Sequence, residues 1–368
     1  NKQYNKIKTQ VNKDILNNLE KGDYILGRNV FELEKRLSKY VGVEECVTCA
    51  SGTDALLIPL MAYQIGAGDA VFTTNFSYFA TTEVISLVGA SPIFVDINNQ
   101  TFNIDPNFLE NQILQTLTEG RLKPKAIIAV DLFGQLADYQ KIQEIAKKYN
   151  LILIEDAAQS FGASFKGKKS CSFGDVSATS FFPAKPLGCY GDGGAIFTND
   201  KKLADLCRSI RVHGKGEDKY DNIRVGLNSR LDTIQASVLL NKLNIFDDEL
   251  MQRNEVAEIY KQKLNNYLVV PYVSEGSISS WAQYSLLAKS SDERDNLMNY
   301  LKEKGIPTAI YYKKLFSNLG IYRDNISSEF PVSKEISDRI FSIPMHPYLE
   351  DDDINQITNR IKKYFSHE

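Results

Sequence analysis

Histidine is scarce in this chain, and its cysteines follow no ligand pattern. Cys46 and Cys49 have the C-x-x-C spacing of zinc and redox sites, but the sequence contains no second pair of that kind. A structural zinc site needs further cysteine or histidine ligands, and the chain's histidines are His213, His346 and His367. We therefore expect no metal site and interpret Cys46 and Cys49 as part of a strand.

Long apolar runs and an excess of charge of one sign are also missing. No stretch approaches the length of a membrane span, and no charged segment followed by an apolar stretch and a cleavage site opens the chain. The 43 basic and 46 acidic residues are mixed along the sequence, so no basic face attracts nucleic acid or anionic lipid. Five scattered cysteines, an odd number, favour a reducing compartment over a disulfide framework. We expect a cytoplasmic protein that binds neither nucleic acid nor a membrane.

The order of apolar runs and amphipathic stretches predicts an α/β fold. Strand-type runs alternate with helical patterns, such as the one at 138–149, and this alternation indicates a mainly parallel sheet covered by helices. The predicted strands lie at 71–73, 92–96, 126–130, 151–154 and 176–181. A helical pattern from 231 to 264 leads into shorter elements. We therefore predict a large α/β domain at 1–246 and a smaller C-terminal α+β domain at 247–368.

Parallel sheets bind ligands at the carboxyl ends of their strands, so residues directly after each run are informative. Glu155 and Asp156 come directly after the run at 151–154. Extended geometry sends their side chains to opposite faces, and we choose Asp156 as the carboxylate of a site. A helix cap is the alternative interpretation.

Lys185 follows the next strand, between apolar residues and glycines. Poor solvation there lowers the pKa of its amine and favours Schiff-base chemistry, although a solvated loop lysine is the alternative. Ser180 precedes it as a hydroxyl that can hold phosphate. Gly52 and Thr53 open an apolar helical stretch, where free N–H groups favour an anion. An amine, a carboxylate and a phosphate site together match the needs of pyridoxal 5'-phosphate (PLP).

Aromatic residues follow the strand at 71–73. Tyr78 is the candidate that could present its ring to a cofactor, whereas Phe76 and Phe79 are better explained as core residues.

Four segments resemble, in order and spacing, the DegT-type family of PLP-dependent nucleotide-sugar aminotransferases. The similarity extends over nearly the whole chain. The segments are Ser51–Thr53, Glu155–Ser160, Ser180–Lys185 with its glycine-rich tail Gly191–Gly194, and Asn228–Asp232.

The resemblance implies an aspartate aminotransferase-type fold (PLP fold type I) and a homodimer with shared active sites. It implies that Lys185 carries PLP as an internal aldimine, that Asp156 pairs with the pyridine nitrogen, and that Gln159 bonds to the ring oxygen. Tyr78 would stack on the ring. Gly52, Thr53 and Ser180 would hold the phosphate, with Asn228 reaching it from the partner subunit.

The resemblance further implies transfer of the amino group of glutamate to a nucleotide-linked keto-sugar for surface glycan biosynthesis. The stretch 181–200 is most similar to enzymes that aminate UDP-linked 3-keto sugars of the 3-oxo-glucuronic acid type. Arg230 would meet a carboxylate or diphosphate. Tyr312, His213 and Tyr220 are further substrate-binding candidates, and Arg224 lies in the same polar stretch as the last two.

Alternative substrates and functions remain open at this stage. The segment Tyr311–Leu315 lacks the proline that those enzymes tend to have after a tyrosine, so a C4 ketone or a dTDP- or GDP-linked 6-deoxy keto-sugar is the alternative. A PLP sugar dehydratase would carry histidine in place of Lys185. A DNA-binding regulator would need a basic recognition helix, and a non-catalytic scaffold would not need the lysine and the acid together.

Overall fold

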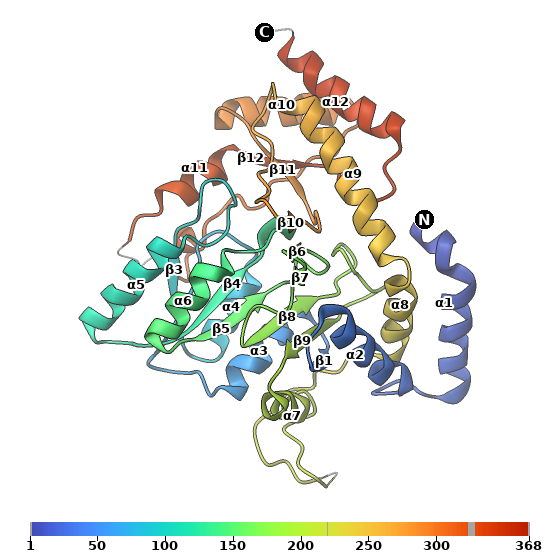
Figure 1. The fold of residues 1–368 in the computed structure, drawn as a ribbon, viewed down its shortest axis with the longest axis vertical. Helices are drawn as coiled ribbons and strands as arrows, with labels where there is room; N and C mark the ends of the chain where they lie inside the picture. Colours follow the sequence, from blue (N-terminus) through green and yellow to red (C-terminus); the bar gives the residue numbers. More distant parts are fainter. Residues whose placement is uncertain (1, 219, 323–327, 367–368) are drawn as a thin grey trace.

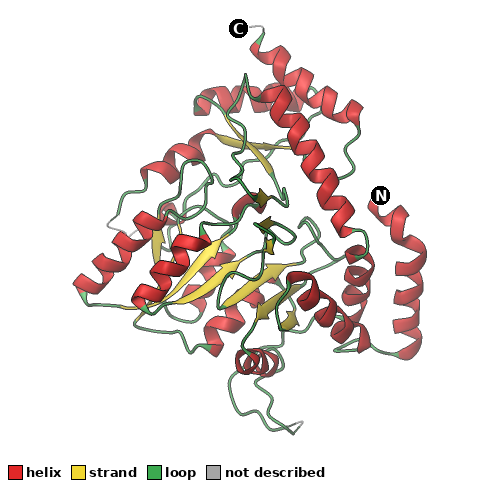
Figure 2. Ribbon diagram, viewed as in Figure 1, coloured by secondary structure: helices red, strands yellow, loops and turns green. Residues whose placement is uncertain are grey.

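A mainly parallel sheet forms the centre of the molecule. The computed structural model describes residues 2–218, 220–322 and 328–366. Within them seven strands pair in the order β1-β9-β8-β5-β4-β2-β3, and Figures 1 and 2 show helices on both sides of this sheet. The strands are β1 (Glu45–Cys49), β2 (Asp69–Thr74), β3 (Ser91–Val95), β4 (Lys123–Val130), β5 (Ile152–Asp156), β8 (Val176–Ser180) and β9 (Gly194–Thr198).

The five predicted strands are confirmed as β2, β3, β4, β5 and β8, with ends that differ by a few residues. They run parallel to one another. β9 is antiparallel to β8, and β1 is antiparallel to β9. The connection between β8 and β9 carries no crossover helix, and a parallel return would require one. The predicted α/β class with a mainly parallel sheet is therefore confirmed.

Alternate residues of the strands face two different helical layers. Val71, Ala126 and Ile154 point toward one layer, and Phe72, Ile127 and Leu153 point toward the other. The first layer contains α3 (Gly52–Ala62), α4 (Ala80–Leu87) and α7 (Lys201–Ile210), and the second contains α5 (Pro106–Glu119) and α6 (Tyr139–Tyr149). Because both faces are covered, the strands read as continuous apolar runs.

A third group of helices covers the sheet edge near β1 and β9. α2 (Arg28–Val41) and α8 (Thr233–Leu243) share an apolar cluster with Phe181 and Phe197. α1 (Lys2–Lys21) packs against α8. The helical pattern predicted at 231–264 is confirmed as two helices, α8 and α9 (Phe246–Leu264).

The C-terminal part has its own apolar cluster, built around Tyr260, Leu297 and Ile357. The predicted boundary at 246 coincides with the first residue of α9, and the division into two domains stays a prediction. The elements after α9 are β10 (Ser277–Ile278), β11 (Tyr284–Leu287), α10 (Ser291–Glu303), η2 (Phe316–Asn318), α11 (Pro331–Arg339), β12 (Ile340–Ile343) and α12 (Asp351–Phe365). β10 pairs with the short hairpin β6 (Ser164–Phe165) and β7 (Lys168–Lys169).

Across the described ranges, no helix combines the length and the apolar character needed to cross a bilayer.

A buried ion pair joins α2, β1 and the end of α7. Arg211 Nη1 lies 2.5 Å from Glu34 Oε1 and donates to the Thr48 carbonyl at 2.7 Å. The same Glu34 oxygen accepts hydrogen bonds from the backbone N–H and the hydroxyl of Thr48, both at 2.9 Å. A long loop leaves the fold directly after Arg211 and projects below α7 in Figure 1; its described residues are 212–218 and 220–228.

We expect Arg211→Met to lower the free energy of unfolding by about 3–5 kcal/mol, because it leaves the Glu34 carboxylate buried without its cation. Urea denaturation measures the change. Arg208→Met is the matched control: its ion pair with Glu45 is one-third exposed on the arginine side, so its loss should cost no more than about 1 kcal/mol. Equal losses in the two variants would contradict this interpretation.

Candidate active site

The carboxyl ends of β2, β5 and β8 bring the predicted site residues to one edge of the sheet. Asp156 is the last residue of β5 and Ser180 the last of β8, and these strands are hydrogen-bonded neighbours. Tyr78 follows β2, and Lys185 lies in the loop that leaves β8. Parallel pairing therefore gathers residues that are more than one hundred positions apart in the chain.

Asp156 is buried and held by two hydrogen bonds. Its Oδ2 accepts from the Thr81 hydroxyl at 2.7 Å, and its Oδ1 accepts from the Ala158 N–H at 3.2 Å. Burial raises the pKa of Asp156, while these two donors and the positive charge of Lys185 oppose the rise. The sequence did not predict a role for Thr81, because a hydroxyl three residues after Tyr78 follows no pattern that indicates a contact with Asp156.

Glu155, the alternative acid, points to the opposite face of the sheet. Its oxygens accept hydrogen bonds from the N–H groups of Cys171 and Phe173 and from the Ser177 hydroxyl, at 2.7–2.8 Å. Burial raises its pKa. This carboxyl fixes the segment that leads into β8, whereas Asp156 faces Lys185. The alternation expected from extended geometry explains the difference.

Lys185 lies half-buried in the loop 181–193, where its backbone N–H donates to the Phe182 carbonyl at 2.8 Å. Burial lowers the pKa of its amine, and the negative charge of Asp156 partly opposes that effect. The lowered pKa agrees with the expectation from its apolar and glycine-rich surroundings. The uncharged amine that nucleophilic chemistry requires is therefore more accessible at Lys185 than at a solvated lysine.

The first turn of α3 packs closely against the end of β8. Ser51 caps α3, because its hydroxyl accepts from the Asp54 N–H at 3.1 Å. Gly52 and Thr53 precede that N–H, so their own N–H groups belong to the unsatisfied first turn of the helix. A Cβ built on Gly52 would lie 2.5 Å from Ser180 Cβ. A helix start, a hydroxyl and a position that only glycine fits thus form a small polar cradle.

Gln159 and Tyr312 form a second polar contact beside Asp156. The Gln159 amide donates to the Tyr312 hydroxyl at 3.1 Å, and its oxygen accepts from the Phe133 N–H at 2.8 Å. The Tyr312 ring lies 6.1 Å from that of Phe76 and 6.4 Å from that of Tyr78. Phe76 is fully buried, as a core residue should be, whereas Tyr78 is 59% exposed and open to a ligand.

The segment 228–230 lies beside the same helix start. Ser229 donates to Asp54 Oδ2 at 2.6 Å and accepts from the Ala50 N–H at 3.2 Å. Asn228 itself is exposed, and Arg230 is half-buried. The expected reach of Asn228 into a partner subunit stays a prediction.

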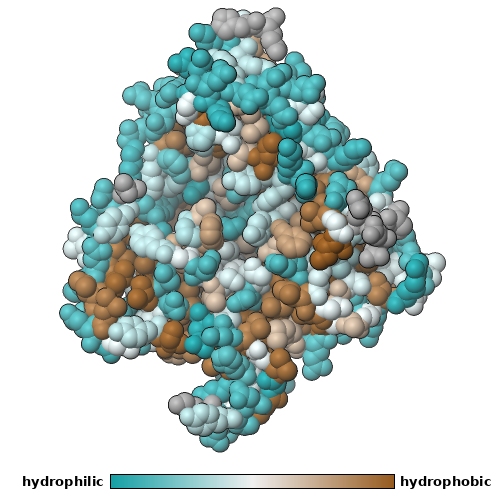
Figure 3. Space-filling view, turned by 180° about the vertical axis from the view of Figure 1, so that it is seen from behind, coloured by the Kyte–Doolittle hydropathy of each residue, from teal (hydrophilic) through white to brown (hydrophobic). Residues whose placement is uncertain are grey.

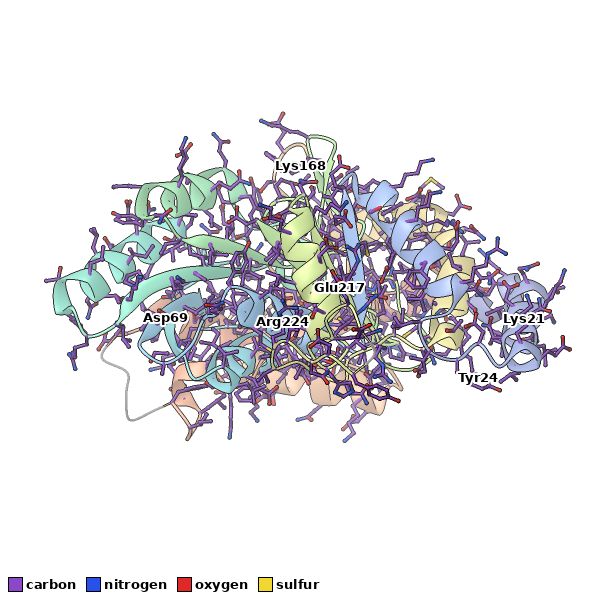
Figure 4. The ribbon with its side chains drawn as sticks, turned by 90° about the horizontal axis from the view of Figure 1, so that it is seen from below. Lys21, Tyr24, Asp69, Lys168, Glu217 and Arg224 are labelled. Carbon is purple, nitrogen blue, oxygen red and sulfur yellow. The ribbon has the colours of Figure 1, made fainter. Side chains whose placement is uncertain are left out.

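His213 and Tyr220 lie on the projecting loop that follows Arg211 and, within the described residues, do not join the group around Asp156. Both are exposed, and the backbone of His213 accepts from the Asn222 side chain at 2.9 Å. Arg224, on the same loop, donates to the Ser209 hydroxyl. Figure 4, seen from below, shows this loop through its labelled residues Glu217 and Arg224.

No metal-binding group of three or more histidine, cysteine, aspartate or glutamate side chains occurs in the part of the chain that the structure describes. The five cysteines are buried and form no disulfide.

We expect Gly52→Ala to destabilise the protein by about 1–3 kcal/mol, because the new methyl group overlaps Ser180. The double variant Gly52→Ala/Ser180→Gly should recover part of that loss, since the contacting Cβ is then absent. A thermodynamic cycle of the two single variants and the double variant measures the coupling. Strict additivity would show that the two positions do not contact each other.

Comparison with known proteins agrees with this geometry. A protein from Pseudomonas aeruginosa, named UDP-2-acetamido-2-deoxy-3-oxo-D-glucuronate aminotransferase, is 46% identical over 346 residues, which cover 94% of this chain and 93% of that protein. The crystal structure of a DegT DnrJ EryC1 StrS aminotransferase from Brucella abortus matches with a TM-score of 0.96 and 48% identity, over 98% of this chain and 97% of that one.

A more distant structure, from Bacillus subtilis and described with bound cofactor PMP, matches with a TM-score of 0.88 and 29% identity, over 97% of this chain and 82% of that one. These matches confirm the expected aspartate aminotransferase-type fold. The sequence profile described as the DegT/DnrJ/EryC1/StrS aminotransferase family matches residues 5–362, so the resemblance inferred from the motifs is confirmed. The chain belongs to the DegT/DnrJ/EryC1/StrS aminotransferase family.

Proposed function

We propose that the protein is a PLP-dependent aminotransferase that transfers the amino group of glutamate to a UDP-linked sugar with a ketone at C3, for surface glycan biosynthesis. The observation that carries this proposal is the pairing of a buried carboxyl, Asp156, with a half-buried amine of lowered pKa, Lys185, at the carboxyl edge of a parallel sheet. Perturbed groups of opposite sign at such an edge are typical of catalytic sites.

The residues around Lys185 fit PLP. The cradle of Gly52, Thr53 and Ser180 suits a phosphate, because only glycine at position 52 leaves room beside Ser180. Asp156 suits the protonated pyridine nitrogen, and the exposed ring of Tyr78 suits the face of the cofactor. The Gln159 amide nitrogen has a second hydrogen besides the one given to Tyr312, so it can still donate to the ring oxygen.

Each side chain then has a defined task. PLP, when bound, supplies an electron sink for breaking a bond to hydrogen at the substrate carbon. The negative charge of Asp156 would keep a proton on the ring nitrogen. Hydrogen bonds from Thr81 and Ala158 fix the orientation of its carboxylate. Lys185 would accept the proton from the substrate carbon and return it to the cofactor side. Its lowered pKa suits this role, because a base must be uncharged to accept a proton.

The UDP-linked C3 ketone is favoured by the Pseudomonas aeruginosa relative, whose name specifies a UDP-linked 3-oxo-glucuronate derivative. Arg230 would bind its carboxylate or diphosphate through a planar fork, and Tyr312 would face the sugar beside Gln159. His213 and Tyr220 would contact the nucleotide from the projecting loop. A C4 ketone or a dTDP- or GDP-linked 6-deoxy sugar is the alternative substrate.

We further propose a homodimer with shared sites that works in the cytoplasm. Tyr24, Ile25 and Phe31 expose 49%, 48% and 54% of their surfaces. Figure 3 shows apolar residues gathered over the lower half of the rear face, and Figure 4 shows Tyr24 projecting from the fold near the end of α1. Such a surface favours association. Asn228 is exposed and therefore available to a partner's phosphate, and five unpaired cysteines favour a reducing compartment.

We expect Lys185→Ala to abolish transamination while the thermal unfolding temperature stays near that of the wild type. Added PLP should give the wild type a visible absorption band that glutamate bleaches, and glutamate should not bleach the cofactor band with Lys185→Ala, because that variant lacks the amine that transfers the proton. Lys169→Ala is the matched control, because burial also lowers the pKa of Lys169, which lies over the Tyr40 ring. It should behave as the wild type, and turnover by Lys185→Ala would refute the assignment.

We expect kcat/KM with glutamate to be at least about tenfold higher for a UDP-linked 3-keto sugar than for its C4-ketone isomer or for dTDP- and GDP-linked 6-deoxy keto-sugars. Arg230 accounts for part of the preference if the substrate carries a carboxylate. A panel of these sugars measures it, with Arg230→Gln as the comparison for the carboxylate. Preference for a C4 ketone would replace the C3 assignment and leave the aminotransferase assignment intact.

A further inference from the structure

The loop that carries Lys185 is closed on itself at its base. The Phe181 N–H donates to the Gly193 carbonyl, and the Cys189 N–H donates to the Phe181 carbonyl, both at 2.7 Å. The Cys189 thiol adds contacts to the carbonyls of Phe181 and Gly191 at 3.1 Å. These bonds fix the two ends of the loop.

The outer part of the loop is held by helix α8. Lys242 Nζ donates to the Gly188 carbonyl at 2.5 Å and lies 4.5 Å from the centre of the Tyr190 ring. Two turns earlier on the same helix, the Gln235 side chain accepts a hydrogen bond from the Tyr190 N–H at 2.8 Å. Lys242 therefore contacts the loop three residues beyond Lys185.

Gly188 transmits this contact to the segment just before Lys185. A Cβ at Gly188 would lie 2.7 Å from the carbonyl oxygens of both Phe182 and Pro183, so the backbone of Gly188 is packed directly on that of residues 182–183. The Phe182 carbonyl also accepts the Lys185 N–H. A displacement of Gly188 consequently displaces the backbone that positions the Lys185 amine.

Burial of Lys242 has an energetic cost that a purely apolar contact would avoid. The residue is 4% exposed, and desolvation of its ammonium lowers its pKa to about 8, against the opposing charge of Glu249. Glu249 is itself buried and accepts from Gln3 at 2.9 Å and from the Tyr348 hydroxyl. The hydrogen bond from this buried ammonium to the Gly188 carbonyl is explained if Lys242 holds Gly188 in position.

We propose that Lys242 is a positioning residue for Lys185, acting through its hydrogen bond to the Gly188 carbonyl. The inference rests on the proposed role of Lys185 and adds the group that holds its loop in place.

The test is the rate at which PLP attaches to Lys185 in the protein stripped of cofactor. The adduct is trapped with borohydride and assigned by peptide mass spectrometry, and melting temperatures are recorded in parallel. Lys242→Met keeps an unbranched side chain, one heavy atom shorter than lysine, and removes its donors. We expect attachment to become roughly tenfold slower, as for loss of one charge-assisted hydrogen bond. Hydrogen exchange of residues 182–190 should become faster in the same variant.

Asn241→Ala is the matched control from the same helix. Its side chain bonds to Asp14 of α1 and to the Ser237 carbonyl instead of the loop, so we expect the attachment rate of the wild type. If Lys242→Met does not fold, Lys242→Gln replaces it, because glutamine is polar but carries no charge and is one heavy atom shorter than lysine, so the contact with the Gly188 carbonyl is lost. A folded variant of either kind that attaches PLP at the wild-type rate would overturn the proposal.

The pH profile separates positioning from a general loss of stability. The ratio of the wild-type rate to the Lys242→Met rate cancels the ionisation of Lys185, and it should fall as pH rises through about 8, where Lys242 loses its proton. The titratable groups that face Lys242 are Glu249, Cys189 and Tyr190; burial raises the pKa of Cys189 and of Tyr190, which places both above this range. A ratio that does not change with pH would contradict the proposal. Failure of the wild type itself to attach PLP at Lys185 would instead refute the proposed function.

Discussion

The parallel pairing of β4, β5 and β8 is the constraint on which the site depends. Its register sets Val130 beside Asp156 and Asp156 beside Ala178, two residues before the end of β8. The loops after the three strands therefore leave the sheet at the same edge. The Asp131 N–H extends this pairing by one further bond, to the Asp156 carbonyl at 3.0 Å. A shift of one residue in β5 would exchange the faces to which Glu155 and Asp156 point, and Asp156 would then lie on the other side of the sheet from Lys185.

Burial then gives the two key side chains their chemistry. Asp156 and Lys185 are both moved toward their uncharged forms by desolvation, and each limits this effect on the other through its charge. Hydrogen bonds from Thr81 and Ala158 add to the stabilisation of the Asp156 anion. The outcome is a buried acid whose charge is supported by its neighbours and an amine whose protonated and free forms are closer in energy than in water.

Close backbone approaches set the shape around these groups. Gly52 lies against Ser180, and Gly194 lies against the Ser51 carbonyl, where a Cβ would come within 2.3 Å. Gly188 lies on the backbone of Phe182 and Pro183 in the same way. Gly188 and Gly194 therefore allow close contact with neighbouring backbone, whereas Gly191 and Gly193 lie against the side chains of Gln235 and Leu231. Lys242 and Gln235 of α8 hold the loop between β8 and β9 from outside.

The sequence by itself determined the strand order along the chain, the α/β class and the candidates Asp156, Lys185, Ser180 and Gly52, because these depend on local patterns and on residues directly after apolar runs. It also predicted that Glu155 and Asp156 would separate, since alternation is a property of any extended strand. Only the tertiary structure decided that Thr81 bonds to Asp156, that Gln159 joins Tyr312 across 153 residues, and that Lys242 reaches Gly188 across 54. Those contacts arise from how helices and loops pack on the sheet, and packing between distant segments leaves no periodic signal in the chain.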